Sequence, residues 1–435
     1  MVQSSQLVFI APRVKNSHLR FVVLAVLFSL SMLTIVDRVA VSAAKMDIAH
    51  ELQFTDITFG WIFGAFALGY AFFQIPAGLL ADRLGSRLPM ASLVGLWSLV
   101  TGLTIVIHRP AMFAVVWFLF GAAEAGAFPI SARVIRSWMP ARETGVAQGI
   151  IFVGSRLGAA CGLMLVSWSI AMHGWRFSFL VLGVLGVTWA LVWLLWFRNT
   201  PEESPWVSAA ERAYIRSDRP LPPVDAVSVL KSAASPNIWE LRETPALIVQ
   251  YFASNFTFFL CFTWFLPYLR QRYQLGAAEA GVMAAVPLYF GAAANWISGF
   301  TVDRLYRRNW GRVSRVTPAF VGFVLGAVAM CIAPHAQKPV GAVLALAIAT
   351  FGVDLTLSPS WTLCIDIAGG HTGTLSGAMN MCGNMGSFVS SLAFPVLFRW
   401  TGRYETFFYI AAIINLLGAI LWLDLRDRLT PIKTP

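Results

Sequence analysis

Long apolar runs, separated by short polar turns, dominate the sequence. A helix needs roughly 20 apolar residues to cross a bilayer, and runs of about that length recur from one end of the chain to the other. Each run therefore predicts one membrane-spanning helix. The predicted spans are residues 21–44, 57–80, 88–108, 111–134, 146–169, 175–197, 246–269, 280–302, 316–334, 339–363, 373–397 and 404–425. The predicted fold class is an all-α membrane protein with twelve transmembrane helices.

One long polar stretch divides these spans into two groups of six. It covers residues 198–243, and within it a short amphipathic helix is expected at Ser208–Asp218. The predicted organisation is a six-helix half at 1–197, a cytoplasmic linker at 198–243, and a second six-helix half at 244–435.

The two halves repeat a short charged motif at matching positions. The sequence Gly78-x3-Asp82-Arg83 ends the second span, and Gly299-x3-Asp303-Arg304 ends the eighth. A single copy would carry little weight, but two copies at matched places indicate a duplicated half. Duplicated halves are typical of carriers that bind their substrate at the membrane midplane, between the halves.

Composition and charge agree with a membrane protein. The chain is 57% hydrophobic and 12% charged, whereas soluble domains carry about 25% charged residues. A net charge of +11 is explained by Lys and Arg retained in cytoplasmic loops. Basic patches interleaved with aromatic residues, which mark nucleic-acid binding, are absent from the sequence. We expect a monomer that spans the cell (inner) membrane many times, with the bilayer as its surroundings, no nucleic-acid partner, and both termini in the cytoplasm.

The sequence offers no pattern for catalysis or for a cofactor. It contains no phosphate-binding loop, no metal-ligand spacing and no GxSxG elbow. The five cysteines lie in or beside apolar runs without CxxC spacing, which favours small core residues over metal ligands or disulfides. We expect no cofactor, no metal and no enzyme activity.

Two adjacent charges, Asp37 and Arg38, interrupt the first apolar run. A charge at the centre of a spanning helix costs about 3 kcal/mol, and neighbouring side chains on a helix point about 100° apart. One interpretation is a mutually neutralising pair near the membrane surface. The other is a carboxylate that titrates beside a cation that binds an anion.

A further carboxylate, Glu124, lies in the fourth span between small residues, in the sequence GAAEAGA. Small residues let helices approach closely and would leave this carboxylate in a tight polar crevice. Binding and releasing a proton there would remove and restore a buried charge. The alternative is a glutamate held in a structural hydrogen bond between helices.

The segment GYAFFQIPAGLLADRLGSR (69–87) resembles the loop signature of the major facilitator superfamily, and TVDRLYRR (301–308) resembles its weaker second copy. Charged residues at these helix ends can bridge neighbouring helices, and such bridges can break and re-form as the halves move. A gating role is therefore expected for Asp82, Arg83, Arg87, Asp303 and Arg304. The alternative is that the arginines only anchor the helix ends at the membrane surface.

Further motifs resemble the anion:cation symporter branch of that superfamily, whose members carry galactonate, hexuronate, glucarate and related acids. These motifs are DR (37–38), EAGAFP (124–129), WMPARE (138–143), SPSWTLCIDIA (358–368) and SGAMNMCGNMG (376–386). The resemblance implies that Asp37 and Glu124 couple protons, and that Arg38 lies near the acidic group of the substrate. It implies substrate contacts for Tyr70, Ser358, Trp361 and Asn380, to which we add Asn384. For Ser358, Asn380 and Asn384 the alternative is a hydrogen bond between helices.

The sequence departs from this branch at one position. Relatives often carry an arginine two turns before the fourth-span glutamate, where this chain has Trp117, while Arg156 lies in the glycine-rich fifth span. We expect that the second substrate-binding cation has moved to Arg156 and that Trp117 fills one side of the site. Asp354 is a candidate partner for Arg156 or Arg38, or for a local hydrogen bond. A smaller organic acid or a sulfonate then becomes as credible as a sugar acid.

The expected function is secondary active transport of a small organic anion, coupled to protons. An anion would neutralise the arginines and protons would neutralise the carboxylates. One alternative is an anion exchanger in which the carboxylates only hold the arginines. A membrane-embedded enzyme and a non-transporting sensor are the alternatives outside transport.

Overall fold

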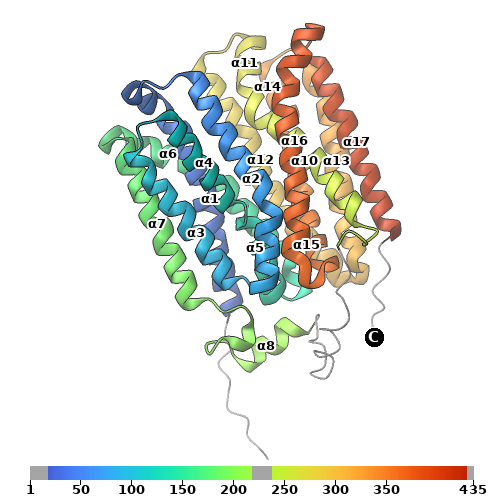
Figure 1. Cartoon of the computed structure of the whole chain (residues 1–435). Helices are drawn as coiled ribbons and strands as arrows, with labels where there is room; N and C mark the ends of the chain where they lie inside the picture. Colours follow the sequence, from blue (N-terminus) through green and yellow to red (C-terminus); the bar gives the residue numbers. More distant parts are fainter. Residues whose placement is uncertain (1–17, 218–237, 429–435) are drawn as a thin grey trace, which may run out of the picture.

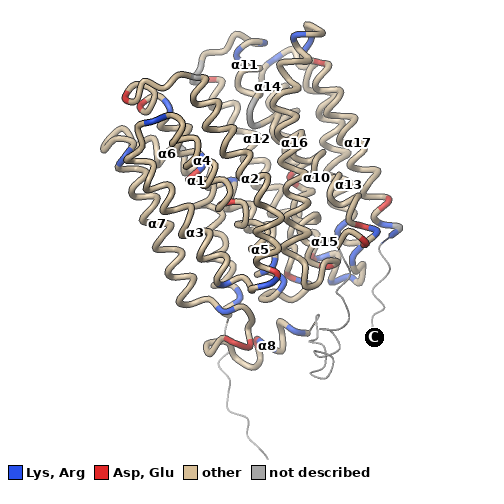
Figure 2. The backbone as a smooth tube through the Cα atoms, viewed as in Figure 1, with Lys and Arg blue, Asp and Glu red and all other residues tan. Residues whose placement is uncertain are grey.

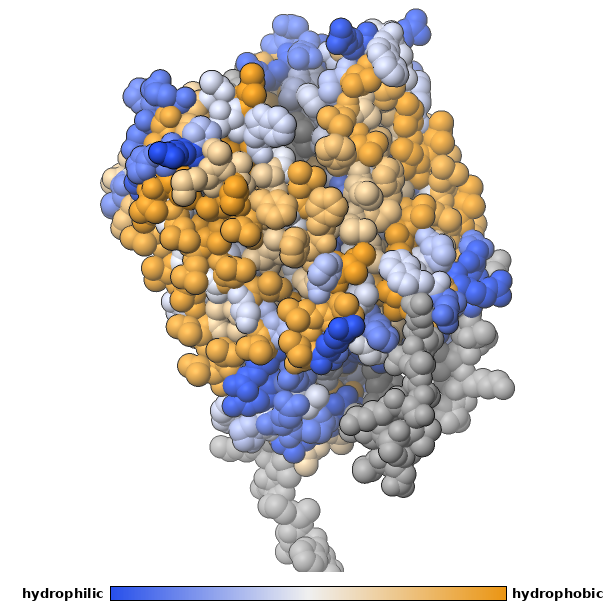
Figure 3. Space-filling model, in the orientation of Figure 1, coloured by the Kyte–Doolittle hydropathy of each residue, from blue (hydrophilic) through white to orange (hydrophobic). Residues whose placement is uncertain are grey.

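The computed structural model describes residues 18–217 and 238–428 and is helical throughout the described residues. Figure 1 shows the helices of the first half (blue to green) beside those of the second half (yellow to red). Outward-facing side chains form an apolar band between two polar ends, as Figure 3 shows for one face. This surface matches the hydrocarbon layer and the two head-group regions of a bilayer.

The first half contains seven α-helices that occupy the six predicted spans. They are α1 (Leu19–Leu52), α2 (Asp56–Leu84), α3 (Arg87–Leu103), α4 (Pro110–Glu124), α5 (Ala127–Trp138), α6 (Thr144–His173) and α7 (Trp175–Trp196). The fourth span was predicted as one continuous helix. Instead it is divided between α4 and α5 at Ala125 and Gly126, where the helical ladder is interrupted directly after Glu124.

The second half repeats this arrangement with further interruptions. Its helices are α10 (Thr244–Phe259), α11 (Phe265–Tyr273), α12 (Ala277–Leu305), α13 (Val316–Ile332), α14 (Pro339–Leu355), α15 (Leu357–Ile367), α16 (Thr372–Thr401) and α17 (Glu405–Arg428). A π-helical turn, Leu260–Trp264, joins α10 to α11. Helices α14 and α15 share the tenth predicted span and meet at Thr356.

The helices account for the twelve predicted spans. Ten segments of the described chain are long and apolar enough to cross a membrane, and one of them, Glu279–His335, contains both α12 and α13. Because α12 and α13 are two spans, these ten segments contain eleven spans. The interrupted α10–α11 helix is the twelfth. Figure 2 shows most charged residues at the two ends of the bundle and a few in its interior.

Close glycine contacts join the halves at one end of the bundle, which we call the linker face because α8 (Ala209–Arg216) lies there (Figure 1). A Cβ atom on Gly78 of α2 would lie 2.1 Å from the carbonyl oxygen of Gly373, at the start of α16. A Cβ atom on Gly299 of α12 would lie 2.5 Å from the carbonyl oxygen of Gly145, at the start of α6. The repeated glycines are therefore needed because the backbones touch at both crossings.

The linker helix α8 confirms the predicted amphipathic segment over the residues that the structure describes; Asp218 lies outside them. The Ser208 hydroxyl accepts a hydrogen bond from the backbone N–H of Glu211 at 3.2 Å and so caps the helix. The buried Glu211 carboxylate accepts hydrogen bonds from the backbone N–H groups of Leu19 and Arg20, both at 3.1 Å. This carboxylate ties α8 to the start of α1.

A second contact supports the attachment of α8 to the first half. The Tyr214 hydroxyl of α8 donates a hydrogen bond to Glu143, which also pairs with Arg20 at 3.0 Å. Burial, together with the neighbouring Glu143 carboxylate, raises the pKa of Tyr214. The phenol therefore stays a protonated donor at neutral pH.

Candidate functional site: buried ion pairs between the two halves

Arg38 of α1 and Glu124 of α4 form an ion pair inside the first half. The Arg38 Nε atom lies 3.0 Å from both carboxylate oxygens of Glu124. The Glu124 side chain is 0% exposed and that of Arg38 is 26% exposed. The arginine therefore faces the accessible side of the pair, with the glutamate enclosed behind it. Arg38 pairs with this glutamate and makes no ion pair with its sequence neighbour Asp37.

Asp37 is buried next to this pair without a hydrogen-bonding partner. Its side chain points into the first half, and among the described residues neither carboxylate oxygen receives a hydrogen bond. The indole of Trp97 from α3 lies near this carboxylate, and its N–H makes no hydrogen bond within the described residues. A buried charge without a partner is strongly unfavourable. A proton on Asp37 would remove that charge.

Aromatic and amide side chains from both halves lie beside Arg38. Its guanidinium group lies 4.4 Å from the centre of the Tyr70 ring, a cation–π contact. The Tyr70 hydroxyl accepts a hydrogen bond of 3.4 Å from the Asn380 side chain of α16. The Asn384 side chain donates to the Asn380 carbonyl at 2.8 Å, within the same helix. Tyr70 and Asn380 therefore meet across the two halves beside Arg38.

Arg156 and Asp354 form a second ion pair, which joins the halves. The Arg156 Nε atom of α6 lies 2.9 Å from Asp354 Oδ2 of α14, and one terminal nitrogen lies 2.6 Å from Oδ1. The guanidinium carbon also lies 3.9 Å from the centre of the Phe258 ring of α10. The sequence left Arg156, Arg38 and a local hydrogen bond as possible partners of Asp354. In the structure the partner is Arg156.

Trp361 and Ser358 are both buried, in different surroundings. The Trp361 indole donates a hydrogen bond of 2.8 Å to the Tyr251 hydroxyl of α10 and packs against the stacked rings of Phe128 and Phe152. The Ser358 hydroxyl donates to the carbonyl oxygen of Gly145 at 2.7 Å. Ser358 therefore makes the contact between helices that was the alternative to substrate binding.

Trp117 lies in an aromatic cluster within the first half. Its ring centre lies 4.8 Å from that of Phe120, 6.3 Å from that of Phe66 and 6.4 Å from that of Phe113. Phe66 in turn lies between this cluster and Arg38, with its ring centre 5.4 Å from the guanidinium carbon. The bulk of Trp117 thus supports Phe66.

The repeated aspartates, Asp82 and Asp303, bind the starts of helices in the opposite half. Asp82 accepts hydrogen bonds from the backbone N–H groups of Gly373 and Thr374 at 3.0 and 2.7 Å. Asp303 accepts from those of Gly145 and Val146 at 2.8 and 2.7 Å. A carboxylate at a helix N-terminus satisfies free donors and complements the helix dipole. The linker face is therefore closed by two equivalent contacts.

The arginines of the repeated motif occupy other places. Arg83 and Arg304 are exposed at the linker face. The Arg87 side chain donates to the carbonyl oxygen of Leu194 at 2.8 Å, which ties α3 to the end of α7 within the first half. Arg133, which the sequence interpretation did not single out, is the residue that pairs with Asp82, at 2.9 Å. It also donates to the carbonyl oxygen of Gly370 in the second half, at 2.9 Å.

Neutralising either aspartate is expected to weaken closure of the linker face. Hydrogen bonds to a carboxylate contribute about 1.5–3 kcal/mol each, so Asp82→Asn and Asp303→Asn should each raise the open fraction by about tenfold or more. The measurement is maleimide labelling of Ser376→Cys, a buried position of α16, after the five native cysteines are replaced by alanine. Asp366→Asn, whose carboxylate pairs with Arg315 inside the second half, is the control. Unchanged labelling in both aspartate variants would contradict a gating role.

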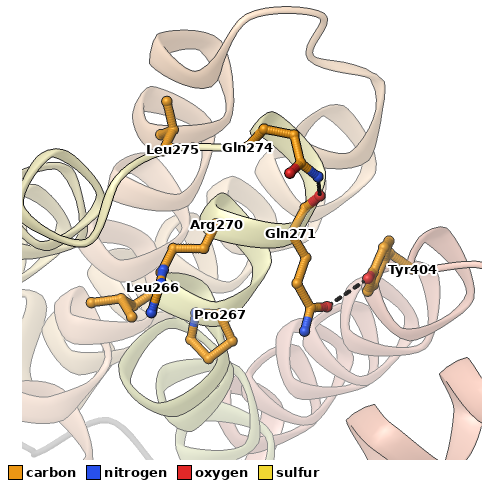
Figure 4. Close-up of a pocket in the computed structure, with 7 residues that line it drawn as sticks. All are labelled: Leu266, Pro267, Arg270, Gln271, Gln274, Leu275 and Tyr404. Carbon is orange, nitrogen blue, oxygen red and sulfur yellow. Dashed lines mark hydrogen bonds between the residues drawn. The ribbon is translucent and has the colours of Figure 1, made fainter.

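A cleft of about 580 Å³ lies at the face opposite the linker and is separate from the ion pairs. Leu266, Pro267, Arg270 and Gln271 line it, together with Gln274, Leu275 and Tyr404. In Figure 4 the Gln271 side chain accepts a hydrogen bond from the Tyr404 hydroxyl, at 2.7 Å, which joins α11 to the start of α17. None of its lining residues was predicted from the sequence to bind substrate.

Two six-helix bundles, with one ion pair buried inside the first and another that joins the two, define a polytopic membrane transporter. The sequence profile of the Major Facilitator Superfamily matches residues 26–391, and the chain belongs to this family. The predicted family, its helical fold and the prediction of a transporter in place of an enzyme are thereby confirmed.

Curated relatives align over nearly the whole chain. The chain is 31% identical to the probable sulfoacetate transporter of Cupriavidus necator, over 96% of each chain. It is 30% identical to the D-galactonate transporter of Escherichia coli O6:H1, over 94% of this chain and 96% of the relative. It is 28% identical to the probable galactarate/D-glucarate transporter of Escherichia coli K12, over 88% and 89%.

Solved structures share the fold. The fucose:proton symporter of Escherichia coli superposes with a TM-score of 0.70 at 16% identity, over 94% of this chain and 99% of the symporter. A proton:xylose symporter superposes with a TM-score of 0.75 at 12% identity, over 94% of this chain and 96% of the symporter.

Proposed function

We propose that this chain is a proton-coupled symporter of small organic anions that works by alternating access. The Arg38–Glu124 pair carries the proposal, because it presents an arginine to the accessible side and encloses its carboxylate partner. An incoming anion would replace Glu124 at Arg38. A proton on the displaced Glu124 carboxylate would then neutralise its charge. Anion and proton would therefore bind together.

Asp37, Tyr70 and Asn380 support this mechanism. Asp37 is buried and receives no hydrogen bond from the described residues, and it is the second proposed proton site. Tyr70 and Asn380 form a hydrogen bond across the halves beside Arg38, where their polar groups could bind the hydroxyl groups of a substrate. Asn384, Trp361 and Arg156 are proposed to complete the site. Ser358 has the weaker case, because its hydroxyl already bonds to Gly145.

The relatives support an organic anion as the substrate class. The substrates for which these relatives are named, sulfoacetate, galactarate, glucarate and galactonate, are all acids. We further propose that the chain works as a monomer in the bacterial inner membrane, with the linker face in the cytoplasm. The arginines at that face support this orientation. The structure would then represent a state closed to the cytoplasm.

The test is uptake of labelled sulfoacetate and D-galactonate into proteoliposomes containing the purified full chain. A gradient of one pH unit is worth about 1.36 kcal/mol per proton, so external acid should drive up to about tenfold accumulation for each coupled proton. Uptake that ignores the pH gradient but exchanges internal for external anion would favour the exchanger. Failure of every tested acid to accumulate or to exchange would contradict organic-anion transport.

A further inference from the structure

The two buried ion pairs share one layout. In each pair the arginine side chain remains partly exposed, at 26% for Arg38 and 14% for Arg156. In each pair the carboxylate is enclosed, with Glu124 0% and Asp354 1% exposed. An anion that approaches either pair therefore meets the cation first. Arg38 also has one terminal nitrogen, Nη2, that is buried and makes no hydrogen bond among the described residues.

Side-chain contacts link the surroundings of the two pairs. Tyr70 packs against Arg38 and accepts a hydrogen bond from Asn380 of α16. One turn further along α16, a Cβ atom on Gly383 would lie 2.5 Å from the Tyr251 ring of α10. Phe258, two turns further along α10, lies against the Arg156 guanidinium group. A series of contacts through α2, α16 and α10 thus connects Arg38 to Arg156.

Asp354 has few polar groups around it. The titratable groups that face it in the described part of the chain are the Arg156 guanidinium group and the Cys261 thiol. Helix α12 approaches Asp354 with the backbone of Gly291, where a Cβ atom would lie 2.1 Å from Asp354 Oδ2. If an anion replaced Asp354 at the Arg156 guanidinium group, Asp354 would be left as a buried charge without a cation. Binding a proton would relieve that penalty.

We propose that Arg156 and Asp354 form a second anion-and-proton site, so that the carrier prefers a substrate with two acidic groups. This inference rests on the function proposed above. One acidic group replaces Glu124 at Arg38, and the other replaces Asp354 at Arg156. Each displaced carboxylate takes up one proton. The two arginines then balance the two negative charges of the substrate, and these four side chains and their ligand carry the same net charge whether the site is empty or loaded.

The substrate preference is tested with two matched pairs of acids. Galactarate and D-galactonate share a six-carbon chain and differ by one acidic group, and sulfoacetate and methanesulfonate differ in the same way. Dissociation constants for the purified full chain should favour the diacid at least tenfold in one pair. The double variant Arg156→Gln/Asp354→Asn, which leaves no unpaired charge, should lose that preference and still bind the monoacid.

Arg176→Gln is the control for this experiment, because Arg176 pairs with Glu51 at the end of the bundle opposite the linker face. Equal affinity for diacid and monoacid in the native chain, or a preference that survives the double variant, would overturn this inference and leave the proposed symport intact. Failure of all four acids to bind would overturn both.

The proton site is tested by coupling stoichiometry. In proteoliposomes, the pH gradient and voltage that abolish net flux of the preferred diacid give the number of protons moved with it. Asp354→Asn should lower this number by one and thereby add one unit of net negative charge to each transport cycle. Asp366→Asn should leave the number unchanged. An unchanged number in Asp354→Asn would overturn the assignment of Asp354 as a proton site.

Discussion

Glu124→Gln is expected to remove the contribution of one proton to acid-driven accumulation of the anion and to preserve exchange of internal for external anion. Glutamine has nearly the same shape and can still accept the hydrogen bond from Arg38, which lies 3.0 Å from the native carboxylate. It cannot take up a proton, so the anion gradient is no longer linked to the pH gradient through this residue. With one pH unit across the membrane, accumulation should fall by about tenfold.

The measurement compares two assays on the same proteoliposomes, uptake against a concentration gradient and counterflow exchange. Glu51→Gln is the matched control, because Glu51 is a partly exposed carboxylate that pairs with Arg176. If Glu124→Gln accumulated anion as well as the native chain under the same gradient, the coupling role of Glu124 would be wrong. A loss of both uptake and exchange would assign Glu124 to substrate binding or folding.

Arg38→Gln is expected to remove anion binding and to destabilise the protein. Breaking a buried ion pair by removal of one partner costs about 3–5 kcal/mol, because the remaining charge is left buried and unpaired. Here the remaining charge would be the fully enclosed Glu124 carboxylate. The substrate would also lose the cation that the structure presents to the accessible side.

Two variants separate these effects. The double variant Arg38→Gln/Glu124→Gln leaves no unpaired charge and should regain most of the thermal stability without regaining affinity. Arg176→Gln, in a partly exposed ion pair, should change neither property by more than about 1 kcal/mol. Thermal unfolding and equilibrium binding of labelled anion are the two measurements. Native affinity in the double variant would rule out Arg38 as the anion-binding cation.

The number and order of the helices could be predicted from the sequence because apolar run length is set by the bilayer. Helix interruptions could not be predicted in the same way. The break at Ala125 and Gly126 and the one at Thr356 lie inside single predicted spans, where run length and hydropathy mark no boundary. The small residues beside Glu124 and the proline at 359 were the available indications. The first helix extends to Leu52, beyond the predicted end at residue 44, because a helix can continue past the apolar run into polar surroundings.

The sequence identified charged residues of the site better than it identified their partners. A charged residue within an apolar run is unfavourable unless it has a partner or a function. For this reason the sequence singles out five charged residues: Asp37, Arg38, Glu124, Arg156 and Asp354. Which residues pair depends on helix rotation and on contacts between the halves. The pairing of Arg156 with Asp354 spans 198 residues, a separation at which local sequence gives no information.

Some site neighbours had no outstanding sequence feature. Tyr251 lies in an ordinary aromatic stretch of the seventh span, and Arg133 looks like a basic residue at a helix end. Their roles depend on single contacts, the hydrogen bond from Trp361 and the ion pair with Asp82. In contrast, the repeated glycine–aspartate spacing was informative, because both copies bind the starts of helices in the opposite half.

The attachment of α8 offers a way to observe the transport cycle directly. Because the Glu211 carboxylate binds the backbone at the start of α1, α8 should move with the first half as one body. A fluorophore or spin label at the exposed Ala213 would therefore report the position of that half, and a second label at the exposed Arg308 would report the other. The distance between these labels would follow opening of the linker face without altering any residue of the proposed site.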